Sequence, residues 1–352
     1  MNINEILQQA VLQEASDIFI IAGLPVTYKC KGQQIRSQTD RLVPATIKPL
    51  IDEIYEISAR DRSNYEKGID DDFSFSISSL GRFRVNIFRQ RGSLAAVIRV
   101  IKFGLPDPAS LGITENVLSM ADNKKGLVLV TGAAGSGKST TLACMIDRIN
   151  SNRSCHIITM EDPIEYIHRH NKAIVTQREI FIDTPGYLES LRSALRESPD
   201  VVLLGEMRDY ETISAAITAA ETGVLLFSTL NTSSASNTIN RIIDVFLASQ
   251  QQQVKIQLAQ ILKGIVAQQL VPQLDGTLIP AFEVLKITPA VQNMIREGKL
   301  HQLDQAMQQG AADGMFTMDM SLLKLYREGK ISKDTALVSC TNYENMLNRL
   351  SK

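Results

Sequence analysis

The sequence is poor in the features that mark secreted, membrane-spanning and zinc-binding proteins. It contains no tryptophan, and its four cysteines (Cys30, Cys144, Cys155 and Cys340) stand singly, without a C-x-x-C pair. Such scattered cysteines argue against a zinc knuckle and fit the reduced thiols of a cytosolic protein. No uninterrupted apolar run approaches the roughly 18 residues that a membrane-spanning helix needs. The start, MNINEILQQA, lacks a basic region followed by an apolar one, so we expect no signal peptide and a cytoplasmic protein.

The sequence also lacks an excess of charge of either sign. Its formal net charge is −1, so nothing in the overall composition favours nucleic acid or an acidic membrane surface as a partner. With 44% hydrophobic and 21% charged residues, it has the composition of a soluble globular protein. A chain of 352 residues is long for a single core, so we expect two or three domains.

The first part of the chain predicts a small α+β domain over residues 1–102. Its segments read as helical at 5–15 and 47–57, and as strand-like at 17–23, 71–77, 81–90 and 95–101. The strands at 71–77 and 81–90 alternate apolar and polar side chains, as half-buried strands do, and the turn signal SSLG at 78–81 joins them. The proline- and glycine-rich segment FGLPDPASLG at 103–112 is the expected linker to the next domain.

Residues 113–352 predict a larger α/β domain with a helical end. Its strands are continuous apolar runs, such as GLVLVTG, VVLLGEM and VLLFSTL, and helical patterns lie between them. This alternation of apolar strands and helices indicates a parallel sheet that is covered on both faces. The last hundred residues read as mostly helical, with a helical portion from about residue 270. One apolar stripe predicts a helix that includes Val254, Leu258, Ile261, Leu262 and Ile265.

The segment GAAGSGKS at 132–139 matches the phosphate-binding pattern G-x-x-x-x-G-K-[ST], between a predicted strand at 127–130 and a helix. Its glycines let the backbone curl so that N–H groups point at a phosphate, and the helix adds its positive dipole end. The alternative is a glycine-rich turn that matches by chance. We expect Lys138 to reach the β- and γ-phosphates, Ser139 to coordinate Mg²⁺ and Thr140 to add a contact. The predicted nucleotide-binding residues are Gly132, Ala133, Ala134, Gly135, Ser136, Gly137, Lys138, Ser139 and Thr140.

Two acidic residues follow predicted strands, which is where ligands bind in open parallel sheets. Glu161 follows the strand in HIITMED, and Glu206 follows VVLLG, in which Gly205 takes the place of the usual strand-ending acid. Nucleotide hydrolysis needs one acid to hold Mg²⁺ and another to orient water, and Glu206 is the better candidate for the water. For either acid, the alternative is an ordinary charge at a helix N-terminus.

Two arginines are candidates for contacts with phosphate. Arg192 and Arg196 are four residues apart and are therefore expected on one helical face. They could form surface ion pairs with Glu189 or Glu197, or they could stabilise the charge of a transferring phosphoryl group. The spacing alone leaves both interpretations open.

The apolar run in VLLFSTLNTSSAS, at 224–236, ends in a polar and uncharged tip around Asn231. Because this run follows VVLLGEMRD and one helix, we expect it to be the next core strand, with its tip at the nucleotide edge of the sheet. The Asn231 amide can donate a hydrogen bond to a phosphate oxygen or accept one from water, but it carries no charge at any working pH.

These motifs together resemble the secretion-superfamily ATPases, and in particular the type IV pilus retraction ATPases (PilT family). The resemblance covers essentially the whole chain. Beyond the phosphate loop, it rests on the Asp-box-like EDPIEY that begins at Glu161, and on GEMRD, a Walker B ending in Gly-Glu, that begins at Gly205. It also includes FRVNIFRQRG, TQREI and the helical stretch SALRESPD.

The resemblance implies a fold, a mechanism and partners. It implies a PAS-like N-terminal domain, a RecA-like P-loop ATPase domain with a helical C-terminal region, and a hexameric ring that binds ATP and Mg²⁺ between domains and neighbouring subunits. Glu206 would be the catalytic glutamate, and Glu161 would lie near Mg²⁺, holding it through water. Four arginines would reach the phosphates: Arg84, Arg99, Arg192 and Arg196. The ring would work with the pilus machinery and a platform protein at the cytoplasmic face of the inner membrane, in peripheral association only and without nucleic acid.

Several features bear on which branch of the superfamily the chain resembles. Assembly and secretion ATPases usually carry a long N-terminal extension and a four-cysteine zinc motif, and this chain shows neither, which favours retraction. AVQNMIRE at 290–297 resembles the retraction family's A-I-R-N-L-I-R-E helix but departs from it at Val291, Gln292 and Met294. The family's His-box histidine is replaced by Asn231. The alternatives are a nucleotide-binding regulatory subunit with weak hydrolysis and, within the family, a pilus assembly or type II secretion ATPase.

Overall fold

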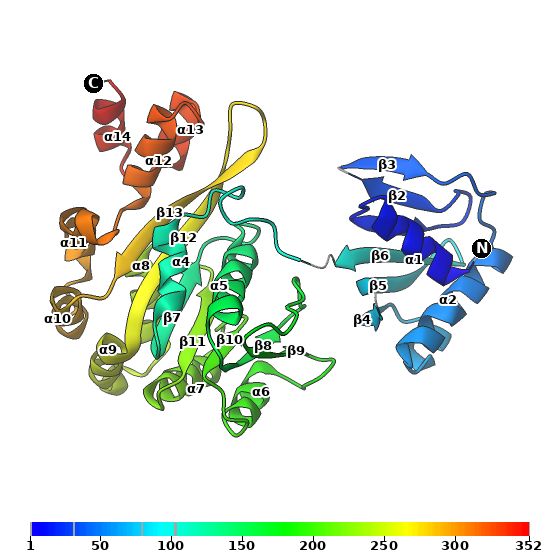
Figure 1. Ribbon diagram of the computed structural model, residues 1–352, viewed down its shortest axis with the longest axis horizontal. Coiled ribbons are helices and arrows are strands. Elements are labelled where there is room, and N and C mark those ends of the chain that lie inside the picture. Colours follow the sequence, from blue (N-terminus) through cyan, green and yellow to red (C-terminus); the bar gives the residue numbers. More distant parts are fainter. Residues whose placement is uncertain (1, 31, 79, 102–103, 352) are drawn as a thin grey trace. The chain divides into compact units, whose positions relative to one another are not determined.

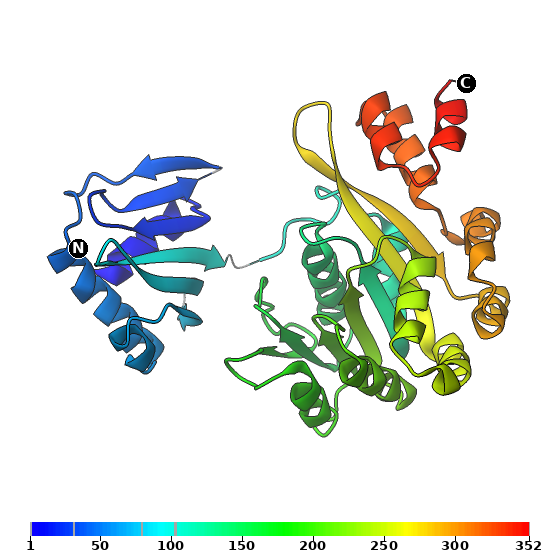
Figure 2. The ribbon, with the colours of Figure 1, turned by 180° about the vertical axis from the view of Figure 1, so that it is seen from behind.

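The computed structural model describes residues 2–30, 32–78, 80–101 and 104–351. They form two compact units, one that ends at Gly104 and also takes in Glu165–Ile167, and one that contains Leu105–Ile164 and the chain from His168 onward. Lys102 and Phe103, at the predicted boundary between domain and linker, lie outside the described residues, as does Ser79 of the predicted turn. Both units are drawn in Figures 1 and 2.

The first unit is an antiparallel sheet with the strand order β3-β2-β1-β6-β5-β4. Its elements are α1 (Ile3–Leu12), β1 (Asp17–Ile20), β2 (Thr27–Cys30), β3 (Gln33–Arg36), α2 (Pro44–Ser58), α3 (Ser63–Glu66), β4 (Asp71–Ile77), β5 (Gly81–Gln90) and β6 (Ser93–Ile101). The alternation predicted for β5 is confirmed, since Phe83, Val85 and Ile87 are buried and the residues between them are partly exposed. The apolar stripes of α1 and α2 join the same core.

The second unit is built on a seven-stranded sheet with the order β13-β12-β7-β11-β10-β8-β9. All neighbours in this sheet run parallel except β12 and β13, which form an antiparallel hairpin. The strands are β7 (Gly126–Thr131), β8 (His156–Glu161), β9 (Ile174–Glu179), β10 (Val201–Leu204), β11 (Leu225–Leu230), β12 (Leu262–Pro272) and β13 (Leu278–Lys286). The predicted parallel α/β architecture is thus confirmed.

Helices cover both faces of this sheet, which is why its strands are apolar without alternation. Every residue of β7 is buried; Leu127 and Leu129 pack into one core, and Val128 and Val130 into the other. The first core contains α6 (Tyr187–Ala194), α7 (Tyr210–Glu221), α8 (Ala235–Asp244), α9 (Ala248–Ile261), α10 (Pro289–Glu297) and α11 (Leu303–Gln309). The second contains α4 (Glu115–Leu118), the short 3₁₀ helix η1 (Ser119–Asp122) and α5 (Lys138–Asn152).

The helix predicted through Leu262 and Ile265 is wrong in its second half. Helix α9 ends at Ile261, and the chain continues directly into β12, which pairs with β7 on one side and β13 on the other. A β-carbon at Gly264 would lie 2.5 Å from the sulfur of Met120 and 3.1 Å from the Leu285 carbonyl oxygen. This close strand packing, together with β-branched Ile265 and Val266, favours a strand that local periodicity cannot distinguish from a helix.

The last part of the chain is helical, as predicted, but only after β13. Besides α10 and α11 it contains η2 (Leu300–Gln302), η3 (Gly310–Asp313), α12 (Met318–Arg327), α13 (Lys333–Ser339) and α14 (Tyr343–Leu350). The last three helices share a small core with the end of the β12–β13 hairpin, built around Val271, Ile279 and Leu322. Among the described residues, no helix combines the length and the apolar character needed to cross a bilayer.

Candidate active site

Four neighbouring parallel strands end at one edge of the second unit's sheet, and a predicted site residue lies at or just after the end of each strand. The phosphate loop follows β7, Asn231 follows β11, Glu206 follows β10, and Glu161 is the last residue of β8. Because adjacent parallel strands are in register here, these residues lie along one edge of the sheet although their positions in the sequence are far apart.

The phosphate loop curls through three glycines with positive φ, a conformation that other residues rarely adopt. Gly132, Gly135 and Gly137 have φ values of +149°, +76° and +88°, and Gly137 is the N-cap of α5. A β-carbon at Gly132 would lie 2.2 Å from the Gln268 carbonyl oxygen, and one at Gly137 would lie 2.8 Å from the Gln268 side-chain nitrogen. Gly132 and Gly137 therefore serve both the curl of the loop and the close approach of β12.

Several hydrogen-bond donors gather at the loop, as a phosphate site requires. The amide groups of Ala134, Gly135, Gly137 and Ser139 donate to no acceptor among the described residues. The Lys138 ammonium group lies over the loop, donating to the carbonyl oxygens of Gly132 at 2.8 Å and Ala133 at 2.9 Å. These amides and the ammonium group, at the N-terminus of α5, fit the phosphates of a nucleotide.

Asn231 connects the phosphate loop to the predicted catalytic acid. Its Oδ1 accepts a hydrogen bond from Lys138 Nζ at 3.0 Å, and its Nδ2 donates to Glu206 Oε1 at 3.0 Å. The other carboxylate oxygen of Glu206 pairs with Arg208 Nε at 2.8 Å. The chain of contacts thus runs from the lysine, through a neutral amide, to the glutamate and an arginine.

The backbone at Gly205 explains the Gly-Glu order of this motif. A β-carbon there would lie 2.9 Å from the hydroxyl of Tyr187 and 3.0 Å from the Met160 carbonyl oxygen. The Gly205 carbonyl oxygen also accepts a hydrogen bond from Thr229 at 2.7 Å, which ties β10 to β11. A glycine lets the end of β10 lie close to β8 and Tyr187, where any side chain would be crowded, and the acid follows at Glu206.

Glu161 and Tyr187 complete the acidic edge. Glu161 Oε1 accepts hydrogen bonds from Thr159 at 2.7 Å and from Gln177 at 3.4 Å. Burial raises the pKa of the Tyr187 phenol, and the nearby carboxylates of Asp162 and Glu206 raise it further, so the phenol stays protonated. Sequence reasoning missed Tyr187, because the first residue of a helix carries no signal of its contacts.

The two arginines expected on one helical face do not share a helix. Helix α6 ends at Ala194, and the Arg196 amide belongs to the following turn, in which it donates to the Ser193 carbonyl oxygen at 3.0 Å. The ion pairs proposed as their alternative are absent within the described part of the chain, where Glu197 pairs with Arg178 at 2.7 Å instead. Arg192 and Arg196 are both exposed to solvent.

Arg84 and Arg99 lie in the first unit, directly opposite each other on the antiparallel strands β5 and β6. Arg84 pairs with Asp72 at 2.6 Å, and Arg99 pairs with Asp17 at 3.3 Å. Their side chains are therefore held by carboxylates of their own unit.

The oxygen atoms of two side chains near the loop are of the kind that Mg²⁺ binds. Among the described residues, no three His, Cys, Asp or Glu side chains cluster as a metal cage. Mg²⁺ commonly binds through phosphates with only one or two protein ligands, a role that the Ser139 hydroxyl and the Glu161 carboxylate can fill. The predicted metal residues are thus compatible with the ion by the chemistry of their donors.

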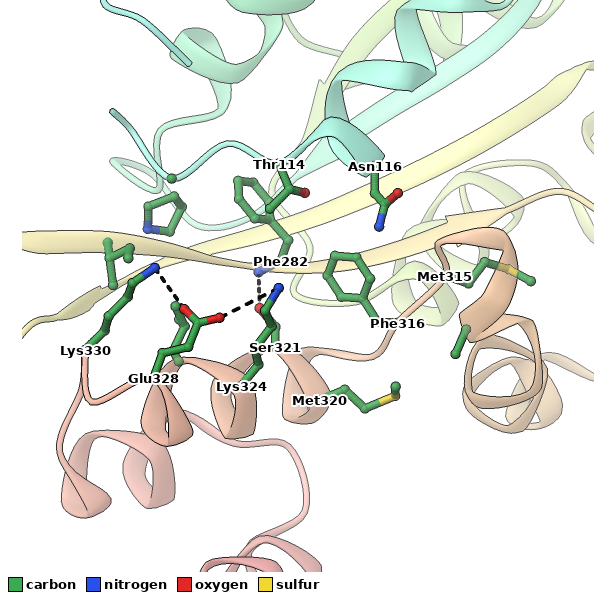
Figure 3. A pocket seen from close by; sticks show the side chains of 15 residues that line it. Thr114, Asn116, Phe282, Met315, Phe316, Met320, Ser321, Lys324, Glu328 and Lys330 are labelled. Carbon is green, nitrogen blue, oxygen red and sulfur yellow. Dashed lines mark hydrogen bonds and ion pairs between the residues drawn. The ribbon is translucent and has the colours of Figure 1, made fainter. Parts of the chain in front are cut away.

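Two cavities lie beside the β12–β13 hairpin. One of about 430 Å³ adjoins the phosphate loop through Gly137 and Thr140, and its size suits a nucleoside. The other, of about 460 Å³, contains no residue of the loop. Figure 3 shows it beside α12, with Phe316 among its apolar side chains and Glu328 between Lys324 and Lys330. Of these two cavities, the first alone borders the phosphate loop.

Sequence reasoning also missed Gln268, because it gave no strand at β12. The Gln268 side chain is 4% exposed, accepts a hydrogen bond from Thr141 Oγ1 at 2.7 Å and donates one to the Ser136 carbonyl oxygen at 2.7 Å. Its hydrogen bonds thus join β12 to the phosphate loop.

Known proteins resemble the chain over nearly its whole length. Residues 1–311 match the family described as type II/IV secretion system protein. The chain is 44% identical to the type IV pilus retraction ATPase PilT of Pseudomonas aeruginosa, over 96% of this chain and 97% of that protein. It is 40% identical to the type IV pilus ATPase PilU of the same organism, over 96% and 88% of the two chains. The crystal structure of the pilus retraction motor PilT with bound ADP is similar, with a TM-score of 0.90 and 43% identity over 99% of each chain.

The fold and the sequence similarity agree. A RecA-like parallel sheet with a phosphate loop, a smaller N-terminal α+β unit and a helical C-terminal region are what the PilT resemblance implied. The chain therefore belongs to the family of type II/IV secretion system proteins, within its group of PilT-like retraction ATPases.

Proposed function

We propose that this protein hydrolyses ATP as a homo-hexameric motor that powers retraction of a type IV pilus by removing pilin subunits. The observation that carries the proposal is the contact of Lys138 and Glu206 through Asn231, which joins the phosphate loop to the glutamate of the Gly-Glu motif. The similarity to PilT over almost the full length of both chains supports the proposal that the motor acts on a pilus. The proposed partners are the pilus machinery and a membrane platform protein, reached from the cytoplasm.

In this proposal each residue of the edge has a separate task. The amides of the loop and Lys138 bind the β- and γ-phosphates of ATP, and Glu206 orients the attacking water and accepts its proton. Mg²⁺, held by Ser139 and through water by Glu161, would neutralise charge on the phosphates. Tyr187 limits the space beside Glu206, since its hydroxyl lies at Gly205.

The four arginines have a proposed role in stabilising the charge of the transferring phosphoryl group. Arg192 and Arg196 are exposed and have no ion pair among the described residues, which leaves their charge available to an anion. Arg84 and Arg99 would exchange their carboxylate partners for phosphate in the assembled ring. We therefore expect that replacing either pair of arginines lowers ATP turnover only in the assembled hexamer.

A change of Glu206 to Gln tests the proposal. The variant should keep its affinity for ATP, because the loop is untouched, and should lose at least about a hundredfold in turnover, because a general base typically contributes that much. The matched control is Glu211→Gln, an exposed glutamate at the start of α7, which should leave turnover unchanged. For each variant, steady-state phosphate release by the purified hexamer measures turnover, and a nucleotide-binding titration measures the affinity for ATP.

The rival function is a nucleotide-binding subunit that regulates a partner motor. Asn231 favours it, since an amide replaces the histidine of the family pattern and cannot carry a proton charge. Wild-type protein that binds ATP but releases no phosphate above the Glu206→Gln background would establish the rival. Cells without the protein separate retraction from assembly, because loss of a retraction motor leaves excess pili that do not retract, whereas loss of an assembly motor leaves none.

A further inference from the structure

Gln268 occupies the point where the phosphate loop becomes helix α5. Its carboxamide contacts the chain on both sides of Gly137, accepting from the Thr141 hydroxyl and donating to the Ser136 carbonyl oxygen, each at 2.7 Å. The Thr141 side chain is fully buried, and Ser136 is 5% exposed. The Ser136 hydroxyl oxygen is itself buried without a partner among the described residues, so its side chain does not hold the loop.

The contact with Ser136 sets the direction of the next amide. In a planar trans peptide the carbonyl oxygen and the following N–H point to opposite sides. Because the Ser136 carbonyl oxygen points to Gln268, the Gly137 N–H points away from it. That N–H is one of the loop amides that have no acceptor among the residues the structure describes.

Gly137 needs this external support, because its own conformation is not fixed by its side chain. Its φ of +88° is a conformation that glycine adopts without steric cost, but glycine can also adopt many others. A peptide unit next to it could therefore rotate and turn its N–H outward. A buried carboxamide that binds the Ser136 carbonyl oxygen before Gly137 and the Thr141 hydroxyl in the first turn of α5 removes that freedom.

We propose that Gln268 is a positioning residue for the nucleotide phosphates: it fixes the peptide unit between Ser136 and Gly137 with its N–H directed at the phosphate. This inference rests on the proposed function and extends it to a strand outside the P-loop motif. Glutamine is suited to the task because it offers one donor and one acceptor on the same planar group. Leucine offers neither, and ionised glutamate offers two acceptors, one of which would face the Ser136 carbonyl oxygen.

The next residue of the strand provides a matched control. Gln269 has the same side chain and lies on β12, but successive side chains of a strand point to opposite faces. It donates to the Ser339 carbonyl oxygen at 3.0 Å, at the end of α13. Gln268→Leu and Gln269→Leu therefore make the same chemical change one residue apart, and only the first reaches the loop.

Calorimetric titration of the full-length hexamer with ADP tests the proposal. Gln268→Leu should raise the Kd for ADP about tenfold or more, equivalent to at least about 1.4 kcal/mol. Gln269→Leu should bind like the wild type. Gln268→Glu keeps the size of the side chain and should also bind ADP weakly at pH 8, but regain affinity relative to the wild type as the pH falls, because a protonated carboxyl can donate to Ser136. A role that depended only on the size of the side chain would produce neither the loss nor the recovery, because glutamate and glutamine have nearly the same size.

The outcomes separate this inference from the function on which it rests. Failure of the wild-type chain to bind ADP would refute the proposed function. Binding by the wild type together with an unchanged Kd in folded Gln268→Leu would overturn the positioning role alone. An equal loss in Gln269→Leu, or no recovery of Gln268→Glu on acidification, would overturn it as well, because the effect would then come from the strand and not from the carboxamide.

Discussion

Glu283 is a buried acid whose replacement should change how stability depends on pH. It lies on β13 with 4% of its surface exposed, and its carboxylate accepts the amide hydrogen bonds of Ala235 at 2.8 Å and Met318 at 3.4 Å. These are the first residues of α8 and α12, so one side chain joins two helix N-termini. Burial raises the pKa of Glu283 from 4.5 to about 7, although the two amide hydrogen bonds oppose the rise.

The size and sign of the effect follow from linkage. Below pH 4.5 the carboxyl is protonated in both the folded and the unfolded chain, and it contributes nothing to the pH dependence. As the pH rises toward 7, the unfolded chain ionises first, so the folded state loses relative stability. At about 1.36 kcal/mol per pH unit, the full penalty above pH 7 is roughly 3 kcal/mol.

Glu283→Gln removes this penalty and should therefore become more stable relative to the wild type as the pH rises. The variant has a constant handicap of about 1 to 3 kcal/mol, since its amide nitrogen cannot accept from the second helix. The difference in unfolding free energy between variant and wild type should nevertheless move in favour of the variant by about 2 to 3 kcal/mol from pH 5 to pH 8.

Urea unfolding, followed by circular dichroism at several pH values, measures this difference. Exchange protection of the β13 amides reports on the second unit alone. Glu344→Gln, at an exposed position of α14, is the control and should show no such trend. A difference between Glu283→Gln and wild type that stays constant from pH 5 to pH 8 would refute the reasoning, because Glu283 would then ionise alike in the folded and unfolded chain.

Two further predictions concern the site. Asn231→His places a titratable ring between Lys138 and Glu206, so its pH–rate profile should gain a transition near the ordinary histidine pKa of about 6.5 that the wild type lacks; identical profiles would mean that the position is only structural. Gly205→Ala should destabilise the protein by about 1 to 3 kcal/mol and lower turnover, because its methyl group would meet Tyr187 and the Met160 carbonyl oxygen. Calorimetric melting and phosphate release test the Gly205→Ala variant, and a melting temperature and turnover equal to those of the wild type would contradict the predicted crowding.

The sequence alone was sufficient wherever the signal is local. The phosphate loop, the buried strands around it and the acids at their ends could all be read from short stretches, since a continuous apolar run followed by a glycine-rich or acidic turn has few other meanings. The parallel order of strands with helices between them then placed Asn231, Glu206 and Glu161 at one edge. The position of Asn231 at that edge was therefore predictable, although its two partners were not.

Only the tertiary structure decided the features that depend on distant pairing. The stripe from Val254 to Ile265 has helical spacing, yet its second half is a strand, because β7 and β13 supply hydrogen bonds and packing at Gly264 that no local pattern encodes. Arg196 falls beyond the end of α6, in a turn that its amide closes with the Ser193 carbonyl oxygen before β10 begins. Gln268 is more than a hundred residues from the loop it contacts, and its role exists only because β12 is inserted beside β7. The sequence by itself determined which groups could do the chemistry, and the pairing of remote strands determined which residues hold those groups in place.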